Sequence, residues 1–263
     1  MHDILQIIIL AVVQGLTEFL PVSSSGHLAL TQHLFGIKEG NLLIALVLHA
    51  GTLLSILIIY ARKLLACLTD KGERHLLLAV IVGTLPVALV GSAVEVSGIM
   101  NTLFSNMGVV GTGLIVTGIV LLTADMKKLD GKNTDGVTVK DALLIGLAQV
   151  PALFPGISRS GMTITAGIRR KLSPEAAAEF SFMLAVPAIA GASLLGPLLD
   201  MFSQNTEPAG VPFYMLAVGF AVSAAVGYAA IKLLLASIKK GGFRGYAFYC
   251  LLLGTGAVVS FFL

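Results

Sequence analysis

Two short polar stretches interrupt an otherwise apolar chain of 263 residues. The first, residues 14–27, reads Gln-Gly-Leu-Thr-Glu-Phe-Leu-Pro-Val-Ser-Ser-Ser-Gly-His. It brings an acid, Glu18, an imidazole, His27, and a run of hydroxyl groups close together in the sequence. Placing an ionisable group inside a membrane segment costs free energy, and the ionisable residues that occur there are usually functional. We therefore expect acid–base or anion-binding chemistry at this stretch.

The spacing within the first stretch predicts a helix that breaks. Gln14 and Glu18 are four residues apart, so on a helix they share one face. Pro21 cannot continue that helix, because its ring clashes with the preceding turn and it has no N–H to donate. The segment that follows, residues 22–26, is small and rich in hydroxyl groups, and its freed backbone amides could face an anion.

The second polar stretch repeats this pattern in the other half of the chain. Residues 149–163 read Gln-Val-Pro-Ala-Leu-Phe-Pro-Gly-Ile-Ser-Arg-Ser-Gly-Met-Thr. Ser-Ser-Ser-Gly at 23–26 matches Ser-Arg-Ser-Gly at 158–161, and a Gln opens both stretches. Paired helix interruptions in two halves of a membrane chain point to a binding site near the middle of the bilayer.

Four side chains are the candidate catalytic groups. Arg159 carries a guanidinium whose fork of donors suits phosphate oxygens, and we expect it to complement Glu18. Glu18 could accept a proton or hold a cation, whereas the nucleophile stays open between Ser24, His27 and water. The amide and hydroxyl groups expected to bind substrate are Gln14, Ser23, Ser25, Ser158, Ser160 and Thr163.

Each of these assignments has a structural alternative. Arg159 could form an ion pair with Glu18 that only stabilises the fold, and Glu18 could be a neutral carboxyl that is hydrogen-bonded between helices. Small hydroxyls also let membrane helices approach closely. A lone imidazole such as His27 is often a core residue that is satisfied by hydrogen bonds. His49 lies outside both stretches, and we expect it to pack or to support the site from behind.

Composition places the chain among integral membrane proteins. Hydrophobic residues make up 56% of the chain and charged residues 12%, with a mean hydropathy of +0.94. Cys67 and Cys250 lack the spacing of a metal or redox pair. The formal charge of +3 does not indicate nucleic-acid binding, because the basic residues lie in short loops between apolar spans. We expect no nucleic-acid partner.

The apolar segments predict the fold. Spans of about 20 residues can cross the hydrocarbon layer. Six segments qualify or nearly so: 42–60, 76–96, 107–123, 174–201, 212–238 and 246–263. Two others, 3–35 and 141–168, hold the polar stretches, and we expect each to dip in and return. The alternative is one full span for residues 3–20.

The predicted fold is therefore an all-α polytopic membrane protein with six transmembrane helices and two re-entrant helical hairpins. The hairpins belong to an inverted-topology internal repeat, with repeat one at about 1–123 and repeat two at about 141–263. The whole chain, 1–263, is expected to be a single integral membrane domain. Non-helical backbone at such depth must be surrounded by protein or water.

The basic residues predict the orientation. All but two of the 17 Lys and Arg residues fall in four segments, 62–74, 127–140, 169–171 and 232–244. The positive-inside rule places these segments in the cytoplasm. Both ends of the second hairpin are then cytoplasmic, and by the repeat logic the first hairpin enters from the outside. The two Lys and Arg residues outside these four basic segments are Lys38 and Arg159.

Both stretches resemble the signatures of the undecaprenyl-diphosphate phosphatase family of the BacA/UppP type. The first is similar to Glu/Gln-x-x-x-Glu followed by Pro-x-Ser-Ser-x-Gly-His, with Gln14 at the first position. The second is similar to Pro-Gly-x-Ser-Arg-Ser-x-x-Thr. The resemblance implies hydrolysis of undecaprenyl diphosphate to undecaprenyl phosphate and inorganic phosphate. This reaction recycles the lipid carrier for peptidoglycan synthesis, and the family is linked to bacitracin resistance.

The resemblance also implies partners and a location. The partners are a polyprenyl diphosphate lipid and the bilayer of the bacterial cytoplasmic (inner) membrane, with the site opening to the periplasmic side. It suggests a divalent cation, Mg²⁺ or Ca²⁺, which we expect to arrive on the substrate. If the protein does hold an ion, the ligand is Glu18. A homodimer stays open. The rival interpretations are a polyprenyl-phosphate transporter or flippase that uses the same inverted-repeat site, and a structural membrane subunit.

Overall fold

The structure is a computed structural model, and it describes residues 4–36, 42–70, 72–124, 131–203 and 211–262. These residues form helices, turns and one isolated bridge, with no strand among them. Among the described residues, four helices are long and apolar enough to cross a membrane: Leu43–Thr69, Arg74–Val94, Phe213–Lys239 and Phe243–Phe262. The prediction of an all-α polytopic membrane protein is confirmed at this level.

The first half contains six helices among the described residues. They are α1 (Ile4–Phe19), α2 (Ser24–Leu34), α3 (Leu42–Thr69), α4 (Arg74–Ser97), α5 (Ile99–Ser105) and α6 (Met107–Leu122). The helix break predicted at Pro21 is present, because α1 ends at Phe19 and α2 begins at Ser24. Helix α5 lies between the predicted segments 76–96 and 107–123. Gly98, with φ 67°, separates it from α4 in a conformation that favours glycine.

The second half also begins with a broken helix, which is followed by long helices. Its elements are η1 (Thr134–Gly136), α7 (Val139–Gln149), η2 (Val150–Leu153), α8 (Arg159–Arg169), α9 (Pro174–Ser203), α10 (Phe213–Lys239) and α11 (Phe243–Phe262). The second predicted break lies between α7 and α8. Helix α3 differs from its expected bounds, since it continues beyond Tyr60, where the backbone is non-helical with φ −105° and ψ 15°.

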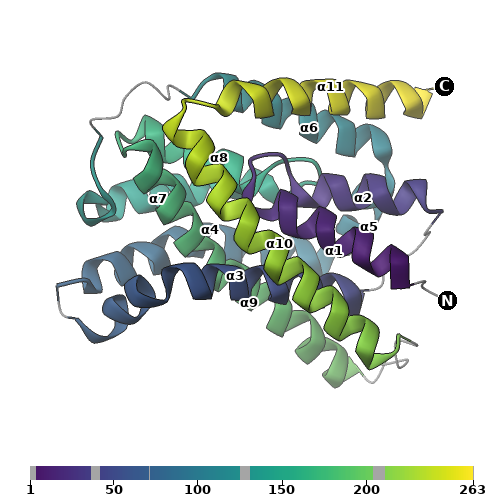
Figure 1. Cartoon of the computed structure of the whole chain (residues 1–263), viewed down its shortest axis with the longest axis horizontal. Helices are drawn as coiled ribbons and strands as arrows, with labels where there is room; N and C mark the ends of the chain where they lie inside the picture. Colours follow the sequence, from purple (N-terminus) through teal and green to yellow (C-terminus); the bar gives the residue numbers. More distant parts are fainter. Residues whose placement is uncertain (1–3, 37–41, 71, 125–130, 204–210, 263) are drawn as a thin grey trace.

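Small residues bring the helices together. Helices α6 and α11 lie side by side along one edge of the molecule (Figure 1). A Cβ placed on Gly111 would lie 2.7 Å from the backbone oxygen of Gly254, so no larger residue fits this crossing without a shift. Helix α1 packs against α10, and α7 packs against α4. Close packing through small residues is the usual way for membrane helices to associate.

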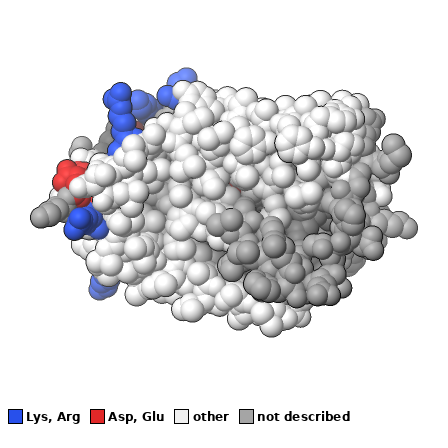
Figure 2. All heavy atoms as spheres, turned by 90° about the horizontal axis from the view of Figure 1, so that it is seen from below, with Lys and Arg blue, Asp and Glu red and all other residues white. Residues whose placement is uncertain are grey.

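Charged side chains gather at one end of the face that Figure 2 shows. Asp141, at the start of α7, is buried and accepts hydrogen bonds from Arg170 Nε at 2.8 Å and from the Thr138 hydroxyl at 2.8 Å. Burial alone raises the pKa of this carboxyl, but the Thr138 and Arg170 hydrogen bonds bring it down to about 2. Asp141 is therefore charged at neutral pH and ties the start of α7 to the residue that follows α8.

The structure does not describe four of the lysine residues considered in the predicted orientation. They are Lys38, Lys71, Lys127 and Lys128. The same holds for Asp3 and Leu263, the outermost residues of two predicted segments.

Candidate active site

The two helix breaks meet, as we had predicted. Glu18, near the end of α1, forms an ion pair with Arg159, the first residue of α8, through Oε1 and Nη2. The Ser160 hydroxyl donates a hydrogen bond to the backbone oxygen of Leu20 at 3.1 Å. The expectation that Arg159 complements Glu18 is therefore confirmed as geometry. An acid from one half of the chain and a guanidinium from the other share one site.

The Glu18 carboxylate has four partners. Besides Arg159, its Oε2 accepts hydrogen bonds from Gln14 Nε2 at 3.0 Å and from the Ser24 hydroxyl at 2.7 Å. His49 Nε2 lies 3.8 Å from the same oxygen. The Glu18 side chain is only 5% exposed, so the donors of Arg159, Gln14 and Ser24 replace the water that an ionised carboxylate needs. The carboxylate is thereby held in one orientation.

His49 reaches the site from α3, which carries neither polar stretch. The sequence indicated only a packing or supporting role, because a histidine on a long apolar helix shows no partner in its own neighbourhood. The contact exists because α3 packs against α1, which carries Glu18. Helix packing alone decides which face of α3 meets the carboxylate.

His27 lies in the first turn of α2, and its ring nitrogens have partners other than Glu18. Its Nδ1 is 2.8 Å from the backbone oxygen of Ser23, and its Nε2 is 2.7 Å from the hydroxyl of Tyr249 on α11. The two rings are stacked, with centroids 5.5 Å apart. Among the contacts that the described residues make, none joins His27 to Ser24 or Glu18. Tyr249 therefore contacts a site residue, although no pattern in the sequence predicted a role for it.

Both helices that begin at the site have the same serine cap. The Ser23 hydroxyl accepts a hydrogen bond from the backbone N–H of Gly26 at 3.2 Å, and Ser158 does the same for Gly161 at 3.1 Å. Such caps satisfy one of the unpaired N–H groups of the first turn. The N-terminal ends of α2 and α8 carry positive partial charge, which favours an anion.

The loop before α8 is held by α6. The Thr117 hydroxyl donates to the backbone oxygen of Gly156 at 2.9 Å and accepts from the Ser158 N–H at 2.9 Å. Gly156 has φ 88°, and a Cβ there would lie 2.1 Å from the backbone oxygen of Val110. Only glycine fits this position. The loop therefore delivers Arg159 to Glu18 in a fixed conformation.

Exposure separates the predicted site residues into two groups. Ser24, Ser25, His27 and Arg159 are partly exposed, so a ligand can reach them. The predicted residues that are buried are Gln14, Glu18, Ser23, Ser158, Ser160 and Thr163. The hydroxyl of Thr163, for example, is 2.6 Å from that of Ser181 on α9. The buried group forms the frame around the accessible one.

The donor set does not fit a divalent cation held by the protein alone. Mg²⁺ takes six oxygen ligands and Ca²⁺ six to eight. Among the described residues, no three His, Cys, Asp or Glu side chains converge as metal ligands. Both oxygens of Glu18, the one carboxylate in this network, are already engaged by Arg159, Gln14 and Ser24. The residues therefore provide too few free oxygen ligands for a resident ion.

Comparison with known proteins adds the family. The family model described as bacitracin resistance protein BacA matches residues 7–256, which include both polar stretches. An undecaprenyl-diphosphatase of Carboxydothermus hydrogenoformans is 41% identical over 97% of this chain and 96% of its own length. Undecaprenyl-diphosphatase 4 of Bacillus cereus is 39% identical over 93% of this chain and 92% of its own. An undecaprenyl-diphosphatase of Desulfosudis oleivorans is 38% identical over 95% and 96%, respectively. The chain therefore belongs to the BacA bacitracin resistance protein family.

Proposed function

We propose that this protein is an integral membrane phosphatase that hydrolyses undecaprenyl diphosphate to undecaprenyl phosphate and inorganic phosphate. The reaction recycles the lipid carrier for cell-wall synthesis and contributes to bacitracin resistance. Support comes from relatives named undecaprenyl-diphosphatase that match nearly the whole chain. The observation that carries the proposal is the contact between Glu18 and Arg159, because it unites the two polar stretches in one site.

Arg159 binds the terminal phosphoryl group in this proposal. Its guanidinium is partly exposed, whereas Glu18 behind it is buried. Incoming phosphate oxygens compete with Glu18 for the guanidinium, whose planar fork can bind two oxygens at once. The same group neutralises the charge that spreads over the phosphoryl oxygens in the transition state. The capped N-terminal ends of α2 and α8 add backbone donors.

Ser24 is the proposed nucleophile. Its hydroxyl already donates to Glu18 at 2.7 Å, so the carboxylate is placed to accept the proton. The Ser24 oxygen forms a bond to the terminal phosphorus, and the bond from that phosphorus to the bridging oxygen breaks. Undecaprenyl phosphate leaves with the bridging oxygen, and water then hydrolyses the phosphoserine. His27 is a poorer candidate nucleophile, because both of its ring nitrogens already have partners.

We further propose the membrane topology. Helices α3, α4, α6, α9, α10 and α11 span the bilayer, whereas the pairs α1–α2 and α7–α8 are re-entrant hairpins. The two repeats, about 1–123 and 141–263, have opposite orientation within the single membrane domain 1–263. Support comes from the order of the elements and from equivalent packing, since α1 packs on α10 as α7 packs on α4. The two hairpins also lie toward opposite sides in Figure 1.

The orientation follows from charge. We place the basic end in the cytoplasm and the open side of the site toward the periplasm, in the bacterial cytoplasmic (inner) membrane. The concentration of Lys and Arg at one end of the molecule supports this orientation by the positive-inside rule (Figure 2).

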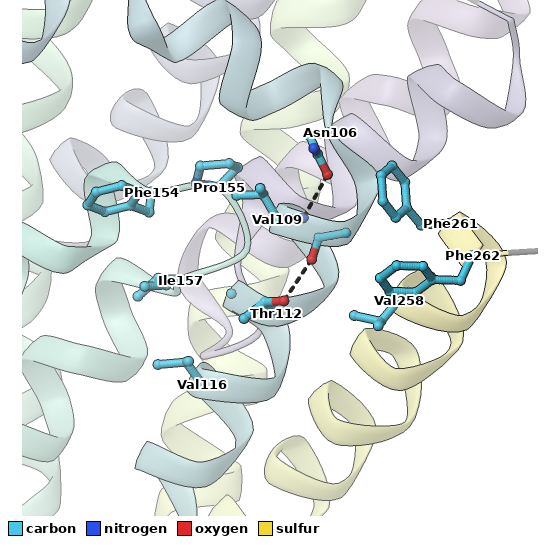
Figure 3. Close-up of a pocket in the computed structure, with 12 residues that line it drawn as sticks. Asn106, Val109, Thr112, Val116, Phe154, Pro155, Ile157, Val258, Phe261 and Phe262 are labelled. Carbon is cyan, nitrogen blue, oxygen red and sulfur yellow. Dashed lines mark hydrogen bonds between the residues drawn. The ribbon is translucent and has the colours of Figure 1, made fainter.

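The lipid tail has a candidate groove next to the loop that carries Arg159. The groove has a volume of about 400 Å³ and lies between α6, α11 and residues 154–157 (Figure 3). Val116, Ile157 and Phe261 are among its apolar lining residues. Ile157 lies two positions before Arg159 in the chain. We place the first isoprene units of the tail here, with the rest of the chain in the bilayer.

A divalent cation, Mg²⁺ or Ca²⁺, enters this proposal on the substrate. The diphosphate supplies oxygen ligands that the described residues lack, and a bound cation would offset its negative charge. The required cation concentration should therefore follow the diphosphate concentration rather than the protein concentration. Rate measurements at several ratios of cation to lipid test this directly.

The test of the proposed function is phosphate release from undecaprenyl diphosphate by the purified protein in lipid nanodiscs. The wild-type protein should release phosphate without any ion gradient, and Glu18→Gln should lose most of the rate. In sealed liposomes, a transporter or flippase would instead move the lipid across the bilayer without producing phosphate. Absence of phosphate release by the folded wild-type protein would contradict the proposal.

A further inference from the structure

Tyr249 and Ser23 together occupy both ring nitrogens of His27. The backbone oxygen of Ser23 is 2.8 Å from Nδ1, and the Tyr249 hydroxyl is 2.7 Å from Nε2. These partners come from opposite ends of the chain, since Ser23 caps α2 and Tyr249 lies in α11. His27 is therefore anchored on one side by its own helix and on the other by the last helix of the protein.

The contact with Ser23 assigns the tautomer of His27. A backbone oxygen can only accept a hydrogen bond, so Nδ1 must carry the proton. In the neutral imidazole, Nε2 is then an acceptor, and Tyr249 donates to it. In the protonated imidazolium, Nε2 donates, and the same hydroxyl accepts. Because a hydroxyl can reverse its role, Tyr249 suits both charge states without any movement of the ring.

The surroundings keep the two rings in place. Tyr249 stacks on His27 with an angle of 13° between the ring planes. The next residue, Cys250, is buried, and its Sγ lies 3.8 Å from the backbone oxygen of Pro21 in the turn between α1 and α2. Helix α11 is thus packed against the turn that precedes Ser24. The position of Tyr249 relative to this turn is set by helix packing rather than by its own side chain.

We infer that Tyr249 is a positioning residue, whose hydroxyl holds the His27 ring in one orientation beside the phosphate site, while the Ser23 backbone oxygen sets the tautomer. This inference rests on the proposed function, in which a diphosphate binds next to Ser24 and Arg159. His27 and Ser24 both belong to the first turn of α2 and are both partly exposed. A negatively charged ligand favours the imidazolium, and the Tyr249 hydroxyl then accepts a hydrogen bond from Nε2–H while the ring keeps its orientation.

The first test removes the hydroxyl and keeps the stacked ring. Tyr249→Phe should lower kcat for undecaprenyl diphosphate about tenfold and change KM less than about twofold, as expected for the loss of one hydrogen bond used in turnover. The matched control is Tyr246→Phe. Tyr246 also lies on α11, but its hydroxyl is 3.0 Å from Ser237. This control should stay within about twofold of the wild-type rate.

A double-mutant cycle separates positioning of His27 from general packing. If Tyr249 acts through His27, adding Tyr249→Phe to His27→Gln should change kcat less than about twofold. The same tenfold loss in the His27→Gln background would overturn the inference, and so would a wild-type rate for Tyr249→Phe alone.

A spectroscopic readout keeps the inference independent of activity. In protein with ¹⁵N-labelled histidine, the His27 resonances are those that disappear in His27→Gln. Tyr249→Phe should shift the Nε2 resonance, whereas Tyr246→Phe should not. Unchanged His27 resonances in Tyr249→Phe would overturn the pairing. If the resonance shifts but the wild-type protein releases no phosphate, the pairing stands and the proposed function fails.

Discussion

Helices α2 and α8 begin with equivalent serine caps but with different reactive residues, Ser24 in α2 and Arg159 in α8. In both, the preceding serine accepts a hydrogen bond from a glycine N–H, at 3.2 Å in α2 and 3.1 Å in α8. In both places the hydroxyl oxygen of that serine is also 3.2 Å from the hydroxyl oxygen of the serine two positions later. The residue between the two serines is a hydroxyl in α2 and a guanidinium in α8. The same pattern of serine hydrogen bonds thus presents two different reactive groups to one site.

The residues behind these helix starts differ as well. Gln14 donates to Glu18, whereas Gln149 is buried and its amide has no hydrogen-bond partner among the described residues. The capping serines also differ, because Ser23 has φ 71° and Ser158 has φ −79°. The first half therefore carries the acid and a capping serine at positive φ, and the second half carries the guanidinium. Each half is incomplete as a site without the other.

The largest expected effect separates Ser24 from its neighbour Ser25. If Ser24 is the nucleophile, Ser24→Ala should lower kcat by at least about 1,000-fold, because only uncatalysed attack by water within the site remains. Ser25→Ala should lower it less than about tenfold, since the Ser25 hydroxyl does not touch Glu18 in the structure. Phosphate release from undecaprenyl diphosphate measures both.

The same variants distinguish a phosphoserine intermediate from direct attack by water. A Ser24→Ala protein that keeps a tenth of the wild-type rate would exclude a phosphoserine and favour direct attack by water. Trapped ³²P on wild-type protein but not on Ser24→Ala would support the covalent intermediate.

The second-largest effect on activity is expected for Arg159, which carries its guanidinium at the start of α8. Arg159→Lys keeps the positive charge but loses the planar fork, so we expect a loss of about 100-fold in kcat/KM. The control is Arg169→Lys at the other end of the same helix, where the arginine donates to the Thr123 hydroxyl at 2.7 Å. It should stay within about threefold of wild type in the same assay. Comparable losses in both variants would mean that Arg159 acts only through folding.

Substitution of the two buried glutamines should affect different properties, namely activity for Gln14 and stability for Gln149. Gln14→Leu removes a donor to the Glu18 carboxylate and should lower kcat about tenfold. Gln149→Leu removes a buried amide without a described partner, so it should leave kcat within about twofold and raise the free energy of unfolding by about 1 kcal/mol. Steady-state kinetics and reversible unfolding in mixed micelles measure the two effects. Equal kinetic losses would contradict the assigned asymmetry.

The smallest expected effect concerns the capping serines. Ser158→Gly removes a cap hydrogen bond at a normal backbone conformation and adds chain entropy to the unfolded state, which should cost about 1 kcal/mol of stability. Ser23→Gly removes the same hydrogen bond but relieves the positive φ, so its net change should be close to zero. Unfolding midpoints of the two variants compare the caps. A larger loss at Ser23 would show that its conformation is not strained.

Much of this arrangement was predictable from local sequence. The apolar segments identified the long helices, because spans of this length and composition have few alternatives to a membrane helix. Pro21 and the serines after it located the first break, and the matching stretch before Arg159 located the second. The pairing of Glu18 with Arg159 was also expected, since each buried charge needs a partner.

Other contacts had no local signal. Tyr249 lies within an apolar helix, and nothing near it in the sequence points to His27. His49 likewise shows its role only once α3 packs against α1. Thr117 is a third case, because its hydrogen bonds to the Gly156 and Ser158 backbone depend on how α6 crosses the loop. Helix α5 was not predicted, because seven residues are too few to show a helical periodicity in the sequence.

The sequence by itself determined the chemical groups, the helices that carry them and the two places where those helices break. These depend on local properties, namely hydrophobicity, proline geometry and serine capping. Only the tertiary structure decided which groups meet. It placed Ser24 rather than His27 against Glu18, and it paired His27 with Tyr249 from α11. Those choices depend on how close each helix crossing is, which small residues such as Gly111 and Gly254 set through long-range packing.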